Sequence, residues 1–316
     1  MTEKIRVGIS SCLLGEKVRY DGGHKLDRLI RDTLGHFLEF VPVCPEVELG
    51  LPTPRETLRL VGDPEHPRLV FSRSGKDITG PMEAWARKRV GELEAEQLCG
   101  FIFKSRSPSS GMERVKLYDR NGVPNKQGVG VFARVFMEHF PLLPVEEDGR
   151  LHDNRLRENF IECLFTFKRW REALARGLSR GNLVDFHTRH KLLLLAHSPE
   201  TYRQMGKLVA AAGTLQPETL YTQYEALLMK GMRLKPTVKK HINVLQHLLG
   251  YFKNQLSADE KQEVLELIEH YRLGHVPLIV PITLINHYVR KYAQPYLKQQ
   301  LYLNPHPLEL QLRNHV

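Results

Sequence analysis

Short apolar runs alternate with amphipathic stretches along the first half of the chain. The runs are rich in β-branched residues, which is typical of strands, while the stretches between them repeat apolar residues at helical spacing. The expected strands are 5–10, 37–43 and 100–104, with a hairpin over 57–61 and 68–72, and the expected helices are 24–34, 81–97 and 128–139. Strands that alternate with helices in this order predict an α/β domain with a Rossmann-like parallel sheet.

Helical periodicity continues through almost all of the second half. Proline, glycine and serine separate the periodic segments, as at helix ends. The expected helices are 153–177, 182–197, 199–212, 217–233, 236–254, 257–273 and 281–300. Residues 144–150 are polar and break the periodicity, so we place a boundary there, between an α/β domain of residues 1–148 and an all-α domain of residues 149–316.

The net charge of +10 is unevenly distributed. Residues 1–150 contain 23 Lys and Arg against 22 Asp and Glu, whereas residues 151–316 contain 23 against 14. A basic second domain beside a neutral first one indicates a polyanionic partner, and nucleic acid is the most common one. The alternative is a basic surface that only keeps the protein in solution.

No apolar run reaches the roughly 18 residues of a membrane span, and the charged start of the chain has no apolar signal core. We therefore expect a cytoplasmic protein with no membrane contact. The four cysteines, Cys12, Cys44, Cys99 and Cys163, are too few for a disulfide framework and too scattered for a Cys-x-x-Cys zinc site. In a reducing compartment such cysteines are metal ligands, nucleophiles or core residues.

Three strands end in loops with chemically capable residues. Cys12 follows the first strand, Cys44 follows the second, and the serine loop 107–110 follows strand 100–104. Ligands of open parallel sheets bind at the carboxyl ends of the strands, so we expect these loops to converge on one crevice. Cys99 enters a buried strand and Cys163 shares a helix face with phenylalanines, and we interpret both as core residues.

Three long motifs resemble the thiouracil desulfidase family. They are Val7-Gly-Ile-Ser-Ser-Cys-Leu-Leu-Gly15 with Arg19-Tyr-Asp-Gly-Gly23, Val41-Pro-Val-Cys-Pro-Glu46 with Gly50-Leu-Pro-Thr-Pro-Arg55, and Lys104-Ser-Arg-Ser-Pro-Ser-Ser-Gly111. The later segments Val145-Glu-Glu-Asp-Gly-Arg-Leu151, Asn243-Val-Leu-Gln-His247 and Val280-Pro-Ile-Thr-Leu284 resemble the helical domain fused to it in tRNA 4-thiouridine desulfidases.

The resemblance implies a [4Fe-4S] cluster held by three cysteines, with one iron left open. Two of the ligand positions are Cys12 and Cys44, and the third, a cysteine in the family, is Ser110 here. A serine hydroxyl is a hard and weakly acidic ligand compared with a thiolate. Three explanations stand open: an altered variant, a cluster ligated by Ser110 or by a neighbour such as Cys99, or a cluster site that has weakened or been lost.

The implied reaction replaces the thiocarbonyl sulfur of 4-thiouridine in tRNA with oxygen from water, without net redox change. Glu46, two residues after Cys44, is the expected acid–base group, and Ser107 and Lys104 are expected to orient the base or stabilise charge. The expected substrate contacts are Ser11, Arg19, Asp21, Gly22 and Ser109.

Basic residues of the second domain are the expected tRNA contacts. One group is Lys230, Arg233, Lys235, Lys239 and Lys240, and the other is Arg189 and Lys191 with His187 and His190. Tyr202, Tyr221 and Tyr224 either stack on RNA bases or belong to the core.

Two other functions compete with this one. The first is a non-catalytic RNA-binding protein with a degenerate cluster site, which the serine at position 110 favours. The second is a nucleotide-binding hydrolase that uses Gly22, Gly23 and the serine loop to hold phosphate. The sequence leaves the oligomeric state open.

Overall fold

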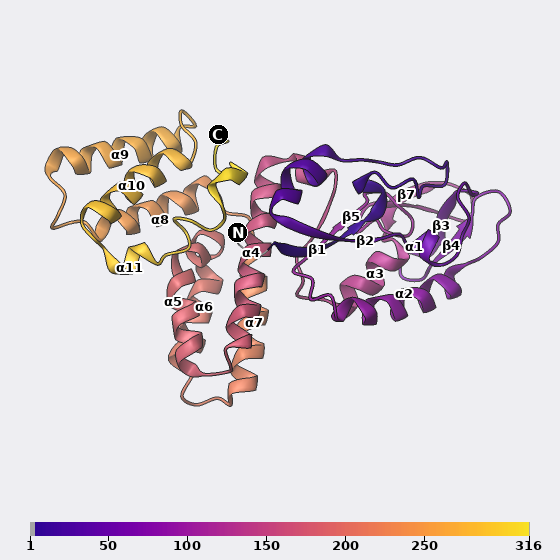
Figure 1. Cartoon of the computed structure of the whole chain (residues 1–316), viewed down its shortest axis with the longest axis horizontal. Coiled ribbons are helices and arrows are strands. Elements are labelled where there is room, and N and C mark those ends of the chain that lie inside the picture. The colour runs from indigo at the N-terminus through magenta and orange to yellow at the C-terminus, as the bar shows by residue number, and fades with distance from the viewer. Residues whose placement is uncertain (1–3, 316) are drawn as a thin grey trace. The chain divides into compact units, whose positions relative to one another are not determined.

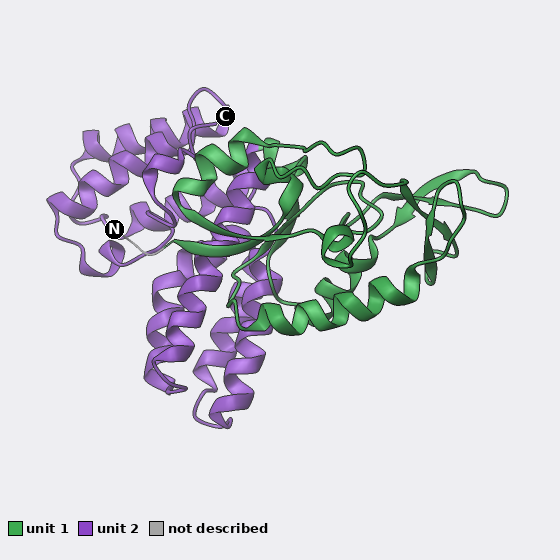
Figure 2. Ribbon diagram, turned by 45° about the vertical axis from the view of Figure 1, so that its right-hand side comes forward, with its two compact units in different colours: residues 1–153 green, residues 154–316 purple. Residues whose placement is uncertain are grey.

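The computed structural model describes residues 4–315. The chain forms two compact units that divide between Asp153 and Asn154, shown in green and purple in Figure 2. The sequence analysis places a domain boundary at 148/149. The order of an α/β unit with a parallel sheet followed by an all-helical region confirms the predicted fold class.

The central sheet of the first unit is wholly parallel. Its strands stand in the order β2-β1-β5-β8, and their bounds are β1 Ile5–Ser10, β2 Leu38–Val43, β5 Phe101–Phe103 and β8 Val145–Glu147. The interpretation of residues 144–150 as a break is wrong, because β8 lies there. The sequence analysis missed this strand because Glu146 and Glu147 are polar. They can be buried in a strand because Glu146 accepts a hydrogen bond from Arg150 at 2.6 Å and Glu147 accepts one from the Met112 amide at 3.1 Å.

A second, smaller sheet has the strand order β4-β3-β6-β7. Its strands are β3 Leu58–Gly62, β4 Pro67–Phe71, β6 Val115–Tyr118 and β7 Pro124–Gly128. The predicted hairpin is confirmed as the antiparallel pair β3–β4. Strands β6 and β7 were not predicted from the sequence, because they are short and four of the five residues of β7 are polar or proline.

Helices α2 (Thr79–Glu94) and α3 (Val131–His139) lie along the same side of the unit in Figure 1. Phe132 and Phe136 of α3 pack on Phe101 and Phe103 of β5, with ring centroids 4.6 to 6.2 Å apart. Aromatic rings at these separations bury a large apolar area between sheet and helix. This core holds the end of β5 in place, and with it the loop that carries Lys104 and the serines.

The helix predicted over 24–34 is wrong in type. Only a π-helical turn, Leu29–Thr33, and a 3-10 turn, Leu34–His36, form there. The amides of Lys25 and Asp27 donate to the carbonyls of Cys12 and Leu13, at 2.9 Å each, instead of to helical partners. These residues therefore brace the loop of Cys12.

The second unit consists of helices. They are α4 Asn154–Ala175, α5 Arg180–His197, α6 Pro199–Ala210, α7 Pro217–Met232, α8 Val238–Gly250, α9 Ala258–Arg272, α10 Ile279–Lys291 and α11 Pro295–Lys298. The predicted helix 281–300 is divided because Ala293 is left-handed, at φ 47°, and the residue before Pro295 disfavours helix. Among the described residues, every helix is too short or too polar to cross a bilayer.

Candidate functional site

The three predicted loops meet at the carboxyl ends of β2, β1 and β5, which are neighbours in the sheet. Cys12 lies in the 3-10 turn Ser11–Leu14 after β1, Cys44 precedes helix α1 (Pro45–Glu48) after β2, and Ser110 lies in the loop after β5. All three side chains line one cavity of about 340 Å³. Residues almost a hundred positions apart thus form a single pocket.

The two cysteine thiols are buried in the wall of this cavity. Burial raises the pKa of Cys12 to about 11, although the charge of Lys104 acts in the opposite direction. Burial, and then the negative charge of Glu46, raises the pKa of Cys44 to about 12. Binding of a metal to these sulfurs therefore releases protons.

Local hydrogen bonds fix the loop of Cys44. Its backbone amide donates to Glu48 Oε1 at 2.9 Å, and its Sγ lies 3.6 Å from Glu46 Oε2. Proline at the first position of α1 favours the start of the helix at this point. Cys44 and Glu46 therefore face the same cavity from one helical turn.

Glu46 is held by groups on two other segments. Ser109 Oγ donates to Glu46 Oε1 at 2.6 Å, and the Arg55 guanidinium lies 3.9 Å from Glu46 Oε2. Ser109 is fully buried behind the wall, whereas Glu46 lines the cavity. The structure therefore places Ser109, predicted as a substrate contact, where it positions the carboxylate instead.

Two glycines allow the serine loop to pack. A Cβ on Gly130 would lie 2.5 Å from the Ser109 carbonyl carbon, and one on Gly111 would lie 2.8 Å from the Ser107 carbonyl oxygen. The amide of Ser110 also donates to Ser107 Oγ at 3.1 Å, which closes the turn. The orientation of Ser110 into the cavity thus depends on Gly130, at the start of α3, which the sequence analysis did not assign to the site.

Lys104 is anchored at the mouth of the cavity. Its Nζ donates to Asp148 Oδ2 and to Ser105 Oγ, both at 2.9 Å, and its amide donates to Ser10 Oγ at 2.9 Å. Burial raises the pKa of Asp148, but Lys104 and the hydrogen bonds from Ser105 outweigh it, and the net shift is downward. Asp148 therefore remains an anion that fixes the lysine.

The remaining predicted substrate contacts differ in position. Ser11 and Arg19 line the cavity, whereas Asp21 and Gly22 do not; Ser107, expected to orient the base or stabilise charge, also lines it. Asp21 is 49% exposed and accepts a hydrogen bond from the Gly23 amide at 3.0 Å, and Gly22 occupies a left-handed turn at φ 76°. The sequence analysis gave no role to four further lining residues: Tyr20, Lys25, Arg55 and Arg106. Three of them, Tyr20, Arg55 and Arg106, lie within the motifs that carry the family resemblance, and that resemblance was the available signal.

The donor chemistry of the pocket fits an iron–sulfur cluster at two of three positions. Cys12 and Cys44 supply sulfur, and Ser110 supplies a hydroxyl that is only 3% exposed. Within residues 4–315, no group of three His, Cys, Asp or Glu side chains is arranged to hold a metal ion. Cys99 is buried away from this cavity, and its amide pairs with the Arg6 carbonyl, so the structure does not favour it as the third ligand.

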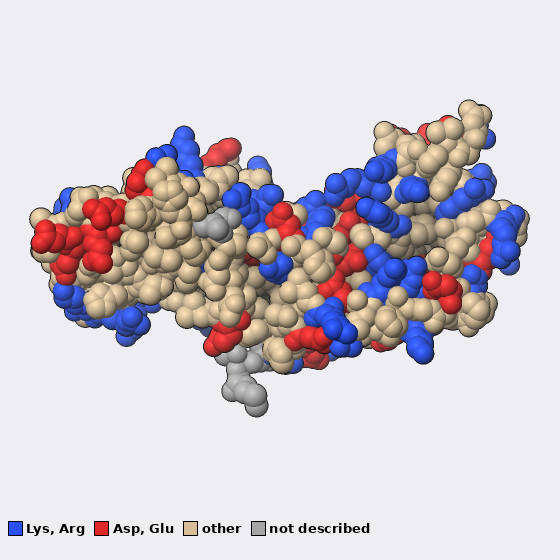
Figure 3. All heavy atoms as spheres, turned by 90° about the horizontal axis from the view of Figure 1, so that it is seen from above, with Lys and Arg blue, Asp and Glu red and all other residues tan. Residues whose placement is uncertain are grey.

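A basic groove of about 1030 Å³ adjoins the cavity. Lys104, Arg106 and the neighbouring loop line both spaces, so the groove leads into the pocket. Its other basic residues are Arg59, Arg114, Lys116, Lys126 and Arg150. On the face seen in Figure 3, Lys and Arg side chains gather around a hollow in this unit. The first domain therefore has a local concentration of positive charge, although its net charge is close to zero.

Some of the predicted tRNA contacts of the helical unit are exposed, and others are buried or bonded within the unit. Lys230, Lys235 and Lys239 are exposed, whereas the Lys240 ammonium donates to the carbonyl of His197. The expectation that His187 and His190 belong to a basic surface is wrong: both are buried, and burial lowers their pKa values, to about 4 for His187. Tyr221 and Tyr224 pack against Trp170 in the core, while Tyr202 borders a surface cleft with Lys191. Arg189 is partly exposed, and Arg233 is exposed at the end of α7.

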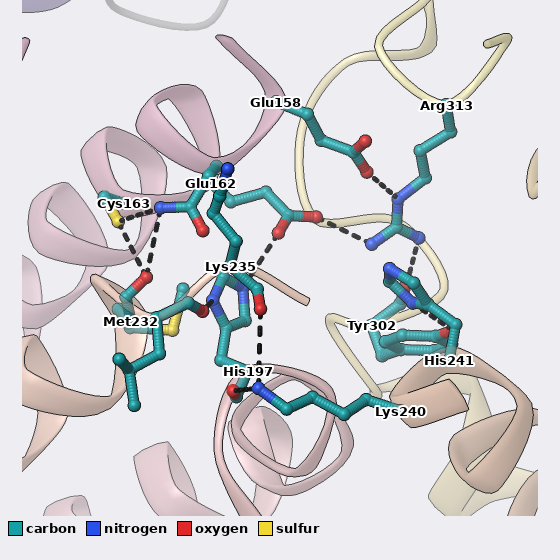
Figure 4. Close-up of polar contacts among 12 residues, drawn as sticks. Glu158, Glu162, Cys163, His197, Met232, Lys235, Lys240, His241, Tyr302 and Arg313 are labelled. Atoms are coloured by element: carbon teal, nitrogen blue, oxygen red, sulfur yellow. Dashed lines mark hydrogen bonds and ion pairs between the residues drawn. The ribbon is translucent and has the colours of Figure 1, made fainter. Parts of the chain in front are cut away.

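A network of buried charges lies at the centre of the helical unit (Figure 4). The Arg313 guanidinium, 3% exposed, donates to Glu162 Oε1 at 2.7 Å, to Glu158 Oε1 at 3.3 Å and to the Tyr302 carbonyl at 2.6 Å. Glu162 Oε2 lies 2.9 Å from His197 Nε2. The charged groups Arg313, Glu158, Glu162 and His197 all have partners within the unit, so we interpret the network as structural.

Comparisons with known proteins divide the chain similarly. The family described as 2-thiouracil desulfurase matches residues 7–148, and a family described as a protein of unknown function, DUF1722, matches residues 191–307. The uncharacterized protein YbgA of Escherichia coli is 34% identical over 161 residues, which cover 51% of this chain and 95% of YbgA. The uncharacterized protein YbbK of Bacillus subtilis is 32% identical over 108 residues, 33% of this chain and 71% of YbbK.

One solved structure is also similar in sequence. It is that of the [4Fe-4S]-dependent thiouracil desulfidase TudS, at 31% identity, and the match covers 48% of this chain and 95% of that chain with a TM-score of 0.40.

Proposed function

The chain belongs to the YbgA-like proteins and carries a 2-thiouracil desulfurase domain, and from that premise we propose that it converts 4-thiouridine in tRNA to uridine. One observation carries the proposal: Cys12, Cys44, Ser110 and Glu46 line the same pocket, which opens into a basic groove. A sulfur-binding site beside a phosphate-binding surface suits a thiolated base within a polynucleotide.

The proposed reaction is a hydrolysis. Water adds to the carbon of the thiocarbonyl group, the carbon–sulfur bond breaks, and the products are uridine and hydrogen sulfide, so no oxidant or reductant is needed. A [4Fe-4S] cluster held by Cys12, Cys44 and the position of Ser110 would supply a Lewis-acidic iron that accepts the departing sulfur.

Glu46 is the general acid–base group of the proposed reaction. Its Oε2 faces the cavity beside Cys44, while Ser109 holds Oε1 at 2.6 Å, so the carboxylate is oriented before substrate enters. In this position it can take a proton from water and return one to the ring. Lys104, fixed by Asp148, presents a positive charge at the mouth, where it can hold the base or the adjacent phosphate.

The basic groove supports a polynucleotide substrate rather than a free base. A free thiouracil has no phosphate to pair with the Lys and Arg residues of the groove. A tRNA backbone can neutralise those that carboxylates do not already pair with, as Asp148 does with Lys104 and Glu113 with Arg114 and Arg150, and so releases counterions. The exposed lysines of the helical unit provide further phosphate contacts. The 4-thiouridine must leave its stack to enter the pocket, at a cost of a few kcal/mol.

Anaerobic reconstitution followed by nucleoside analysis tests the proposal. The chain is loaded with iron and sulfide, incubated with tRNA that contains 4-thiouridine, and the nucleosides are separated after digestion. We expect 4-thiouridine to fall and uridine to rise, with release of sulfide. If the chain holds its iron and the amount of 4-thiouridine in the tRNA does not change, the proposed activity is refuted.

The variant Ser110→Cys tests the ligand assignment, and Cys99→Ser is its control. A third thiolate in the pocket is expected to increase both bound iron and the rate of desulfuration, because thiolate is the better ligand for iron–sulfur clusters. Cys99 lies outside the cavity, so its replacement should leave both unchanged. A protein that binds tRNA but remains without iron in both forms would favour the non-catalytic RNA-binding function.

A further inference from the structure

The helical unit contains a second cleft, of about 330 Å³, that the proposed reaction does not use. It lies between four segments: Lys191 of α5, Tyr202 and Arg203 of α6, Asn243 and His247 of α8, and Tyr296 of α11. Leu192 and Leu195 of α5 are buried and border it. The cleft therefore combines apolar, aromatic and basic surfaces.

Three tyrosines give the cleft its aromatic character. The rings of Tyr251 and Tyr296 are stacked, with centroids 5.2 Å apart and planes inclined by 22°. Tyr202 lines the same cleft as Tyr251 and Tyr296. Burial, and then the neighbouring Tyr251 and Tyr202, raises the pKa of Tyr296. Tyr251 is nevertheless 45% exposed, so part of its ring is free to contact a ligand.

The charges around these rings favour an anionic ligand. Lys191, Arg203 and His247 line the cleft, and no Asp or Glu is among the described residues that line it. Asn243 adds a side-chain amide, which both donates and accepts hydrogen bonds and can pair with the edge of a base. Stacked aromatic rings beside cations and an amide are the arrangement with which proteins bind unpaired nucleotides.

We infer that this cleft binds an unpaired nucleotide of the RNA, with its base stacked on Tyr251 and its phosphate near Lys191 and Arg203. The inference rests on the proposed function, in which the substrate is tRNA, and adds a second contact outside the desulfurase pocket. A polyphosphate chain alone would make no use of the exposed part of the Tyr251 ring. The predicted contacts Lys191 and Tyr202 fall in this cleft. Asn243 and His247 belong to the segment 243–247, which the sequence analysis matched to the helical domain without giving it a role, whereas Arg203, Tyr251 and Tyr296 were not singled out.

The test is RNA binding by the full-length chain, measured by fluorescence anisotropy with labelled tRNA and with a short oligouridylate. Tyr251→Ala is expected to weaken both complexes roughly five- to a hundredfold, the range for loss of one base–aromatic stack. Tyr251→Phe keeps the ring and is expected to bind within about twofold of the unmodified chain. Circular dichroism and a urea midpoint that match the unmodified chain establish that each variant is folded.

Inorganic polyphosphate is the control ligand, because it has charge but no bases. Tyr251→Ala is expected to bind it like the unmodified chain, whereas Arg203→Gln is expected to weaken polyphosphate and RNA alike, and Lys261→Gln, on α9 away from the cleft, to weaken neither. Equal RNA affinity of Tyr251→Ala and the unmodified chain, or an equal loss for polyphosphate, would overturn the inference. Neither result depends on a cluster or on turnover, so failure of the desulfurase assay remains a separate outcome.

Discussion

Removal of the Arg313 guanidinium is expected to destabilise the helical unit more than removal of any exposed arginine. Arg313 is the cation between Glu158 and Glu162, and both carboxylates are largely buried. Burial raises the pKa of Glu162, but Arg313 and then His197 outweigh it and lower that pKa, whereas burial and the charge of Glu162 raise the pKa of Glu158. In Arg313→Met the methionine fills the space of the stem, but the Glu162 charge loses its principal partner.

Loss of one partner from a buried ion pair costs about 3–5 kcal/mol, because the other charge stays desolvated. At a urea dependence of roughly 1–3 kcal/mol per molar, a loss of this size lowers the unfolding midpoint by about 1–5 M. The assay is tryptophan fluorescence during urea unfolding in a Trp85→Phe background, which leaves Trp170 of the helical unit as the reporter, since the chain has two tryptophans. Arg272→Met is the matched control, because Arg272 also pairs with a glutamate, Glu269 at 2.6 Å, but on the surface.

The pH dependence provides an independent check. Because the pKa of Glu162 is lower in the folded chain than its ordinary value of 4.5, its contribution is complete above that value and is lost as the pH falls below it. The stability difference between Arg313→Met and the unmodified chain should therefore narrow in acid. The double variant Arg313→Met/Glu162→Leu should recover part of the loss, since no unpaired charge is left at position 162. Equal midpoints for Arg313→Met and Arg272→Met would refute this reasoning.

Three further predictions concern the desulfurase unit. Glu46→Gln retains the acceptor for Ser109 and should reduce desulfuration about 10²- to 10⁴-fold with unchanged iron content; an unaltered rate in single-turnover assays would exclude Glu46 as the acid–base group. Gly130→Ala should displace the serine loop, because the added methyl group would meet the Ser109 carbonyl, and should lower iron content and thermal stability together, as measured by iron analysis and calorimetry. Lys116→Gln should weaken tRNA binding and reduce the slope of log affinity against log salt by about one, whereas an unchanged slope would place the phosphate backbone outside the groove.

The sequence predicts the elements with a strong period and misses those without one. Six of the seven expected helices of the second unit form near their expected bounds because their apolar faces repeat every 3.6 residues. Strand β8 was missed because its buried residues are Glu146 and Glu147, whose partners come from elsewhere in the fold. The turn at 29–33 was mistaken for an α-helix because the preceding amides bond to the loop of Cys12, a long-range contact that no local pattern reveals.

The residues of the candidate site were likewise predicted in part: those placed by strand order were found, and those placed by long-range contacts were not. The position of Cys12 and Cys44 at one sheet edge could be inferred from strand order, since parallel strands share an edge. The basic groove could not, because the charge summed over residues 1–150 is nearly zero, whereas the lining of the groove has seven Lys and Arg against two acids, Glu113 and Glu147. The hydrogen bond from Ser109 to Glu46 could not be predicted either, because it depends on which of the two adjacent serines, Ser109 or Ser110, points toward Glu46.

The hydrogen bond between Arg313 and Glu162 joins residues 151 positions apart, so during synthesis it can form only after nearly the whole chain has been made. A ribosome makes Glu162 long before Arg313, and for most of that interval the carboxylate has no guanidinium to meet. The pocket of Cys12 and Cys44 is lined by residues 10–110, so the ribosome has made all of them before it reaches Glu162. The residues of this pocket are therefore available for folding early in synthesis, whereas the ion pair of the helical unit forms only after residue 313 has been added.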